Sequence, residues 1–207
     1  MTRGDRASAD RTEPEGELLY PIPTPGRITA VRGSVLIADQ MFLRENGHLE
    51  AYERALSTRS LLAITAAEAI PIATAHAHWN ALDGLALPTS LIQQNGRELA
   101  GRVHGEFLQT LVKLAGKLGF SPWTPLKNTQ KVWGRLYLGS GVAVWRVGET
   151  LARFDVLDMA LCKSRFFRTS CMGGIAGSLA PFCKSVTVFE REALRTESSM
   201  SIRVAWQ

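Results

Sequence analysis

Three cysteines are the residues whose chemistry has to be assigned first. Cys162, Cys171 and Cys183 are separated by gaps of nine and twelve residues. Structural zinc uses four ligands, commonly as two close pairs, so a zinc site would need the fold to gather these thiols with a partner such as His104. Cys171 follows Arg168, and positive surroundings lower a thiol pKa. Free cysteine is also frequent in cores, so we expect packing, with metal binding and a reactive thiol as alternatives.

The other candidate motifs carry little catalytic chemistry. His76 and His78 would chelate a metal from a strand, but in the helix that we expect there they point about 200° apart. The glycine-rich run 172–177 lacks the Gly-Lys-Ser/Thr of a phosphate loop, so we expect close packing or a helix entry turn, with phosphate binding as the alternative. No serine-nucleophile, zinc-protease or paired-carboxylate pattern is present. The sequence therefore identifies no cofactor and gives no positive grounds for an enzyme.

Bulky aromatic side chains collect in the second half of the chain, with arginines among them. The set predicts either an ordinary core or an apolar pocket with a few polar groups at its mouth, which is the usual composition of small-molecule sites. For a pocket, the predicted ligand-binding residues are Trp133, Tyr137, Trp145, Arg146, Arg165, Phe166 and Arg168.

Composition indicates one globular domain with an uneven charge. The chain has 207 residues, 45% hydrophobic and 21% charged, with a net charge of +5. Residues 159–189 hold four basic side chains and no carboxylate, so they form either a solvated face or a surface for an anionic partner. No apolar run reaches the roughly 20 residues of a membrane helix. We expect no transmembrane segment and, with three cysteines and no signal peptide, a cytoplasmic protein.

Hydrophobic periodicity predicts helices first and strands later. Residues 1–26 read as a disordered, acidic, proline-containing tail, and residues 27–207 as a single domain. We expect helices over 34–46, 49–56, 71–84, 90–118 and 125–137, with a short one near 172–182, and Gly101 and Gly105 allowing close packing of the fourth. Beyond a short strand at 28–33, strands follow residue 140, at 142–147, 150–157, 185–191 and 199–206. This order predicts an α+β fold, a helical layer packed on a small antiparallel sheet.

The order of these pieces resembles a group of uncharacterised, myxobacterial-type bacterial proteins. The resemblance spans roughly residues 27–207 and rests on VRGSVLIADQMFLRENG, YERAL, HWNALDGLAL, YLGSGVAVWRVGETLARFDVLD and VTVFERE with MSIRVAW. That group is similar to the 4-vinyl reductase and TRAPP-type domain superfamily, which also includes relatives of haem-nitric-oxide-binding domains. The resemblance implies a domain that is often dimeric, often with an apolar cavity, and used in sensing, vesicle tethering or pigment synthesis. No catalytic set and no haem-ligand motif of these families surrounds His48, His76, His78 or His104.

We therefore predict a non-catalytic ligand-binding or sensory module for an apolar or amphipathic small molecule, acting through a homo-oligomer or a protein partner. The alternative is an interaction or scaffold subunit without a small-molecule ligand. Two further hypotheses rank below the ligand-binding module and the scaffold subunit. They are nucleic-acid binding through residues 163–184 and an enzyme that uses Cys171.

Overall fold

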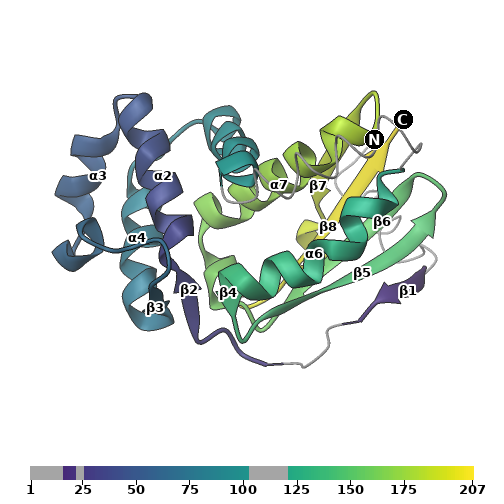
Figure 1. Cartoon of the computed structure of the whole chain (residues 1–207), viewed down its shortest axis with the longest axis horizontal. Helices are drawn as coiled ribbons and strands as arrows, with labels where there is room; N and C mark the ends of the chain where they lie inside the picture. Colours follow the sequence, from purple (N-terminus) through teal and green to yellow (C-terminus); the bar gives the residue numbers. More distant parts are fainter. Residues whose placement is uncertain (1–15, 22–25, 103–120) are drawn as a thin grey trace.

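A helical part and a sheet part lie next to each other along the long axis of the molecule (Figure 1). The structure is a computed structural model that describes residues 16–21, 26–102 and 121–207. The helical part contains α2 (Gly33–Glu45), α3 (Leu49–Ala55), α4 (Ile72–Gly84) and the helical residues 89–102. Within the described ranges, no helix combines the length and apolar character that a membrane crossing needs.

The sheet part is a five-stranded antiparallel sheet with the order β1-β5-β6-β8-β7. Its strands are β1 (Glu17–Tyr20), β5 (Gly141–Gly148), β6 (Leu151–Leu157), β8 (Met200–Trp206) and β7 (Val186–Glu190). Successive side chains of a strand point to opposite faces. The cross-strand row Val144, Phe154 and Ile202 is fully buried and belongs to the inner face. The next row, on the outer face, consists of Trp145, Arg153 and Arg203.

Two helices, α6 (Trp123–Leu136) and α7 (Arg165–Leu179), lie along the sheet, α6 against β5 and α7 against β7 and β8 (Figure 1). Two side chains cap the N-terminus of α7. Ser164 Oγ accepts from the Phe167 N–H at 3.1 Å, and Asp83 of α4 accepts from the Phe166 N–H at 2.7 Å. Such caps satisfy N–H groups that have no partner within the helix. The second cap also ties α7 to the helical part.

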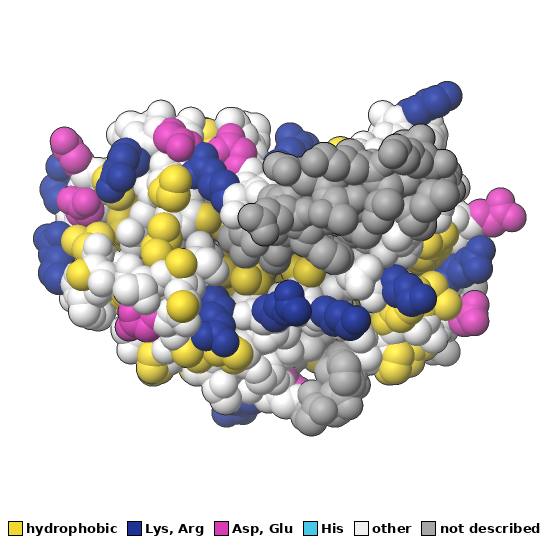
Figure 2. All heavy atoms as spheres, in the orientation of Figure 1, with side chains coloured by type: hydrophobic (Ala, Val, Ile, Leu, Met, Phe, Trp, Pro, Cys, Tyr) yellow, Lys and Arg dark blue, Asp and Glu magenta, His cyan; other side chains and the backbone are white. Residues whose placement is uncertain are grey.

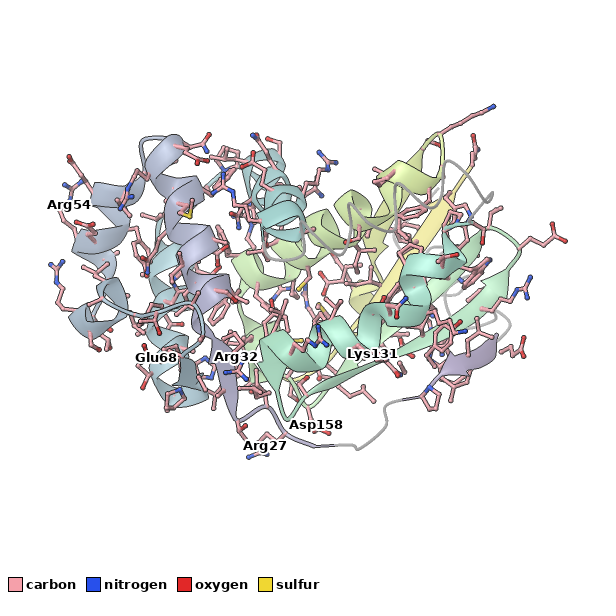
Figure 3. The ribbon with its side chains drawn as sticks, viewed as in Figure 1. Arg27, Arg32, Arg54, Glu68, Lys131 and Asp158 are labelled. Atoms are coloured by element: carbon pink, nitrogen blue, oxygen red, sulfur yellow. The ribbon has the colours of Figure 1, made fainter. Side chains whose placement is uncertain are left out.

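A small three-stranded sheet joins the two parts. It has the order β3-β2-β4, with β2 (Ala30–Arg32) between β3 (Ala69–Pro71) and β4 (Tyr137–Leu138). Arg32 donates from Nη1 to the Ala67 carbonyl at 2.8 Å, beside Glu68 (Figure 3). The Gly33 N–H donates to the Glu68 carbonyl, and a Cβ at Gly33 would lie 2.0 Å from the Thr65 carbonyl oxygen. Only glycine therefore fits where α2 begins.

The predicted α+β class is confirmed, with differences at particular elements. Residues 17–20 form β1 on β5, so this part of the predicted tail is a strand; residues 1–15 and 22–25 lie outside the described residues. The short helix expected near 172–182 begins earlier, at Arg165, because of the two caps. Within the described ranges, 3-10 turns lie at Arg59–Leu62, Ala160–Lys163, Ala180–Phe182 and Glu192–Leu194. The expected helix over 90–118 is described as far as residue 102.

Candidate functional site

A cavity of about 130 Å³ lies between α6, α7 and the inner face of the sheet. Among the described residues, α6 supplies Val132 and Trp133, α7 supplies Phe167 and Ile175, and β6 supplies Phe154. The lining is predominantly apolar. An engineered apolar cavity of similar size, roughly 150 Å³, binds benzene. The space is therefore sufficient for a molecule of about one ring.

Helix α6 forms one wall of this cavity and also faces solvent. Its inner residues recur at helical spacing and line the cavity, whereas Lys127, Lys131 and Arg135 are four residues apart and exposed on its outer side. Lys131 can be located on α6 in Figure 3, and Figure 2 shows basic side chains spread across the same face of the molecule. The helix thus presents an apolar side to the cavity and a basic side to the exterior.

Aromatic rings form one wall of the cavity and hold each other in place. Tyr137 lies 4.6 Å from Trp133 and 5.6 Å from Phe167 between ring centroids, and the second pair is perpendicular. Trp79 of α4 meets Phe167 edge to face at 6.0 Å. These distances fall in the range in which aromatic pairs attract each other beyond simple burial. The wall is therefore a set of mutually fixed rings.

The glycine-rich run predicted to serve close packing does so. A Cβ at Gly173 of α7 would lie 2.1 Å from the Gln93 carbonyl oxygen, and a Cβ at Gly96 would lie 1.9 Å from the Ser170 carbonyl oxygen. The backbones of α7 and residues 89–102 therefore touch directly. In contrast, a Cβ at Gly101 would meet nothing within 4 Å, so the close packing expected there is absent. Gly105 lies outside the described residues.

One end of the cavity is polar and is formed by Asp39 of α2. Asp39 lines the cavity, although its side chain is almost fully buried. Its Oδ1 accepts from Asn95 Nδ2 at 2.6 Å, and its Oδ2 lies 3.0 Å from His78 Nε2. The same Asn95 nitrogen lies 3.4 Å from the hydroxyl of Ser170, which also lines the cavity. These contacts compensate a carboxylate that would otherwise be costly to bury.

A buried hydrogen-bond chain extends from Asp39 into the helical part. A carboxylate only accepts, so His78 Nε2 carries a hydrogen, and in a neutral ring Nδ1 then accepts from a donor. That donor is the Tyr52 hydroxyl of α3, 2.7 Å from Nδ1. Burial raises the pKa of Tyr52, which keeps the hydroxyl protonated. The chain Asp39–His78–Tyr52 therefore connects the cavity to α3 and α4.

Two further polar groups of the cavity, Tyr137 and Cys171, are held in their neutral forms. Burial raises the pKa of both groups well above its ordinary value, and the Asp39 charge raises it further. A phenolate or thiolate is disfavoured when water is removed from around it. At neutral pH the cavity therefore presents a hydroxyl and a thiol beside the Asp39 carboxylate.

The structure brings two of the seven predicted ligand-binding residues to the cavity, Trp133 and Tyr137. Phe166 is core, and the other four lie at different places. Trp145 stacks with Arg153 on the outer face of the sheet, and Arg146 lies over Trp123.

The two remaining arginines of that set have structural partners. Arg165 donates to the Leu87 carbonyl and to Thr89. Arg168 donates to the carbonyls of Cys162 and Lys163 and lies 3.4 Å from Glu190. A role for these side chains in binding stays a prediction.

The three cysteines lie in different surroundings. Cys162 is fully buried and burial raises its pKa to about 12, Cys171 lines the cavity, and the Cys183 thiol lies 3.3 Å from the Leu179 carbonyl. Within the part of the chain that the structure describes, no three His, Cys, Asp or Glu side chains gather as a metal site would need. His104 lies outside those residues, so metal binding by this set stays a prediction. The raised pKa of Cys171 disfavours its use as a nucleophile.

Sequence reasoning missed Asp39 and Asn95. Asp39 occupies a core position in the apolar stripe of α2, between Leu36 and Phe42, where a carboxylate requires buried partners. Asn95 similarly follows Ile92 on the buried side of residues 89–102. A charged or amide residue inside an apolar helix face was the signal in the sequence that could have identified these two buried polar residues.

Comparison with known proteins shows which fold this is. No protein-family model matches the chain, and no curated protein matches it. Among solved structures, the ferrous unliganded H-NOX protein from K. algicida is 9% identical, with a TM-score of 0.61 over 85% of this chain and 96% of that one. An oxygen-binding H-NOX domain related to soluble guanylate cyclases is 15% identical, with a TM-score of 0.56 over 85% and 95%. The chain has the H-NOX fold.

This result corrects the resemblance inferred from sequence. The structural neighbours are H-NOX proteins, so the assignment to the 4-vinyl reductase and TRAPP-type domains is wrong. The segments that carried the resemblance match mainly at apolar and glycine positions of helices and strands. Gly33, for example, serves backbone packing. Such positions record the secondary structure of an α+β domain more than its ancestry.

Proposed function

We propose that this chain is a non-catalytic sensory module that binds a small apolar or amphipathic molecule in the cavity between α6 and α7. The observation that carries the proposal is a mostly apolar cavity with a few polar groups at one end, which is the usual composition of small-molecule sites. The fold supports it, since one neighbour with this fold is described as an oxygen-binding domain related to soluble guanylate cyclases.

A scaffold without a ligand is the weaker reading. It predicts a filled core and a large apolar surface patch. The cavity argues against a filled core. The large apolar side chains that are exposed come from separate elements: Leu18, Met41, Leu62, Leu157, Phe189 and Leu194.

Haem, which the work on several H-NOX neighbours concerns, does not fit the described residues. A cavity of about 130 Å³ suits one ring, whereas haem has four pyrrole rings and an iron. Haem iron takes a histidine, methionine, thiolate or tyrosinate. Among the described lining residues there is no histidine or methionine, and burial keeps Cys171 and Tyr137 protonated. That lining also contains no basic side chain to pair with the haem propionates.

Helix α6 is the element through which an occupied cavity would act on a dimer or protein partner. Its inner side lines the cavity and its outer side carries Lys127, Lys131 and Arg135 at the surface. A shift of α6 on ligand binding would move this basic surface. An acidic partner surface is the chemistry that complements it.

The experiment is thermal unfolding of the protein with increasing toluene. A ligand that binds only the folded state, at a concentration 100 times its Kd, stabilises the folded protein by about 2.7 kcal/mol. This corresponds to a rise of several degrees in Tm. Ile175→Trp should abolish this rise because the indole fills the cavity that Ile175 lines. Met41→Trp adds the same bulk at an exposed position of α2 and should retain the rise. A Tm that does not respond to toluene in a protein that folds normally would refute the proposal.

A further inference from the structure

Tyr137 is a buried residue at the wall of the cavity whose hydroxyl has no hydrogen-bond partner among the described residues. Tyr137 is 5% exposed, lines the cavity, and has its ring fixed by Trp133 and Phe167. Its hydroxyl forms no hydrogen bond with any residue that the structure describes and is not among the fully enclosed polar atoms, so a ligand in the cavity can reach it. An unused donor at the wall of a cavity is the arrangement expected where a ligand supplies the acceptor.

Several of the other polar lining groups already have partners. Thr129 and Ser178 donate to carbonyls of their own helices, whereas the Ser170 oxygen accepts from Asn95 and its hydrogen has no acceptor among the described residues. Asp39 accepts one hydrogen bond on each oxygen, and a carboxylate oxygen has room for a second. Among the described lining residues, the cavity therefore offers hydroxyl donors at Tyr137 and Ser170, and spare acceptor capacity at Asp39.

Charge sets the class of ligand that this end accepts. The Asp39 carboxylate lies at the cavity, and no Lys or Arg side chain is among the described lining residues. An anionic ligand would meet a negative charge without a compensating positive one, in surroundings where charges are poorly screened. A neutral group that both accepts and donates a hydrogen bond meets neither penalty.

From these observations we infer that the cavity selects a neutral molecule of about one ring that carries a single hydroxyl group, which accepts a hydrogen bond from Tyr137. The inference rests on the proposed function and adds the ligand class to it. The ring occupies the aromatic part of the cavity, and the hydroxyl hydrogen is directed to the acceptors of the Asp39 end. Carboxylates of the same size are excluded.

Three probes with the same carbon skeleton test this inference: toluene, benzyl alcohol and benzoate. Their Kd values are measured by calorimetry for the wild-type chain, Tyr137→Phe and Tyr20→Phe. Tyr20 is a half-buried tyrosine on β1 that does not line the cavity, so its variant is the matched control. Circular dichroism and Tm establish that each variant is folded.

We expect the wild type to bind benzyl alcohol, to bind toluene, and not to bind benzoate. In Tyr137→Phe the preference for benzyl alcohol over toluene should fall by about tenfold, as for loss of one buried hydrogen bond, and in Tyr20→Phe it should not change. If toluene binds but Tyr137→Phe leaves the preference unchanged, or if benzoate binds best, the ligand class is wrong and the proposed function stands. If none of the three probes binds, the proposed function fails together with it.

Discussion

At the scale of single residues, Asp39 has the greatest influence on the interior. It is 2% exposed and depends on His78 and Asn95 for its hydrogen bonds. A buried charge whose partner is removed remains desolvated and uncompensated, whereas an exposed pair loses little when it is broken. The chain contains both cases, since Arg54 of α3, which is labelled in Figure 3, forms an exposed pair with Glu50 at 3.9 Å.

Removal of the buried partner should therefore cost far more than removal of the exposed one. We expect His78→Leu to lower the free energy of unfolding by roughly 3 kcal/mol, because both the Asp39 carboxylate and the Tyr52 hydroxyl lose a buried hydrogen-bond partner. Arg54→Ala should lower it by about 0.5 kcal/mol or less. Urea unfolding at pH 7 measures both values. Equal effects of the two substitutions would show that Asp39 and His78 do not form a compensated pair.

The thiol of Cys162 predicts how stability changes at high pH. Burial raises its pKa from 9.0 to about 12, so between these values the unfolded chain loses a proton that the folded chain keeps. The contribution of the protonated Cys162 thiol to the free energy of unfolding is fully present below pH 9 and is lost as the pH rises towards 12. We expect the free energy of unfolding to fall over this range, and to fall less steeply in Cys162→Ala. Identical slopes for the two proteins would contradict the raised pKa.

At the scale of elements, glycine has opposite roles on α7 and α6. Gly173 allows α7 to touch the backbone of residues 89–102, while a Cβ at Gly134 of α6 would meet nothing within 4 Å. A helical glycine without such a contact only weakens the helix. The two positions therefore separate packing from helix propensity.

Alanine substitutions at these two glycines should change stability in opposite directions. Gly173→Ala forces a methyl against the Gln93 carbonyl and should destabilise by at least about 1–3 kcal/mol. Gly134→Ala should stabilise by up to about 1 kcal/mol, since it gains helix propensity at an open site. Chemical unfolding of both variants measures the difference. A stable Gly173→Ala protein would rule out the direct backbone contact.

At the scale of the whole molecule, the fold class followed from the sequence because it depends on local periodicity. The alternation in 150–157 and 199–206 corresponds to β6 and β8, and the apolar stripe in 34–46 to α2. The start of α7 did not follow, because one of its two caps, Asp83, is 83 residues away from Phe166 in the chain. The strand β1 did not follow either, since a four-residue segment becomes a strand only when an edge such as β5 receives it.

The sequence predicted an aromatic-lined cavity but not where in the fold it lies. Trp133 and Tyr137 belong to the aromatic set that the sequence singled out, and both line it. Aromatic residues of the sheet alternate between faces, so Trp145 lies on the opposite side from the cavity. The partners of Asp39 come from α4 and residues 89–102, and such long-range pairings depend on tertiary packing rather than on spacing.

An apolar cavity that accepts small molecules is the feature on which the proposed function depends most. A crystal of the protein pressurised with xenon tests this directly, because xenon enters dry apolar cavities of this size. We predict a xenon peak between α6 and α7, in contact with Phe167 and Ile175, that is absent from crystals of Ile175→Trp. A crystal structure in which side chains fill this space, with no xenon bound there, would contradict the account.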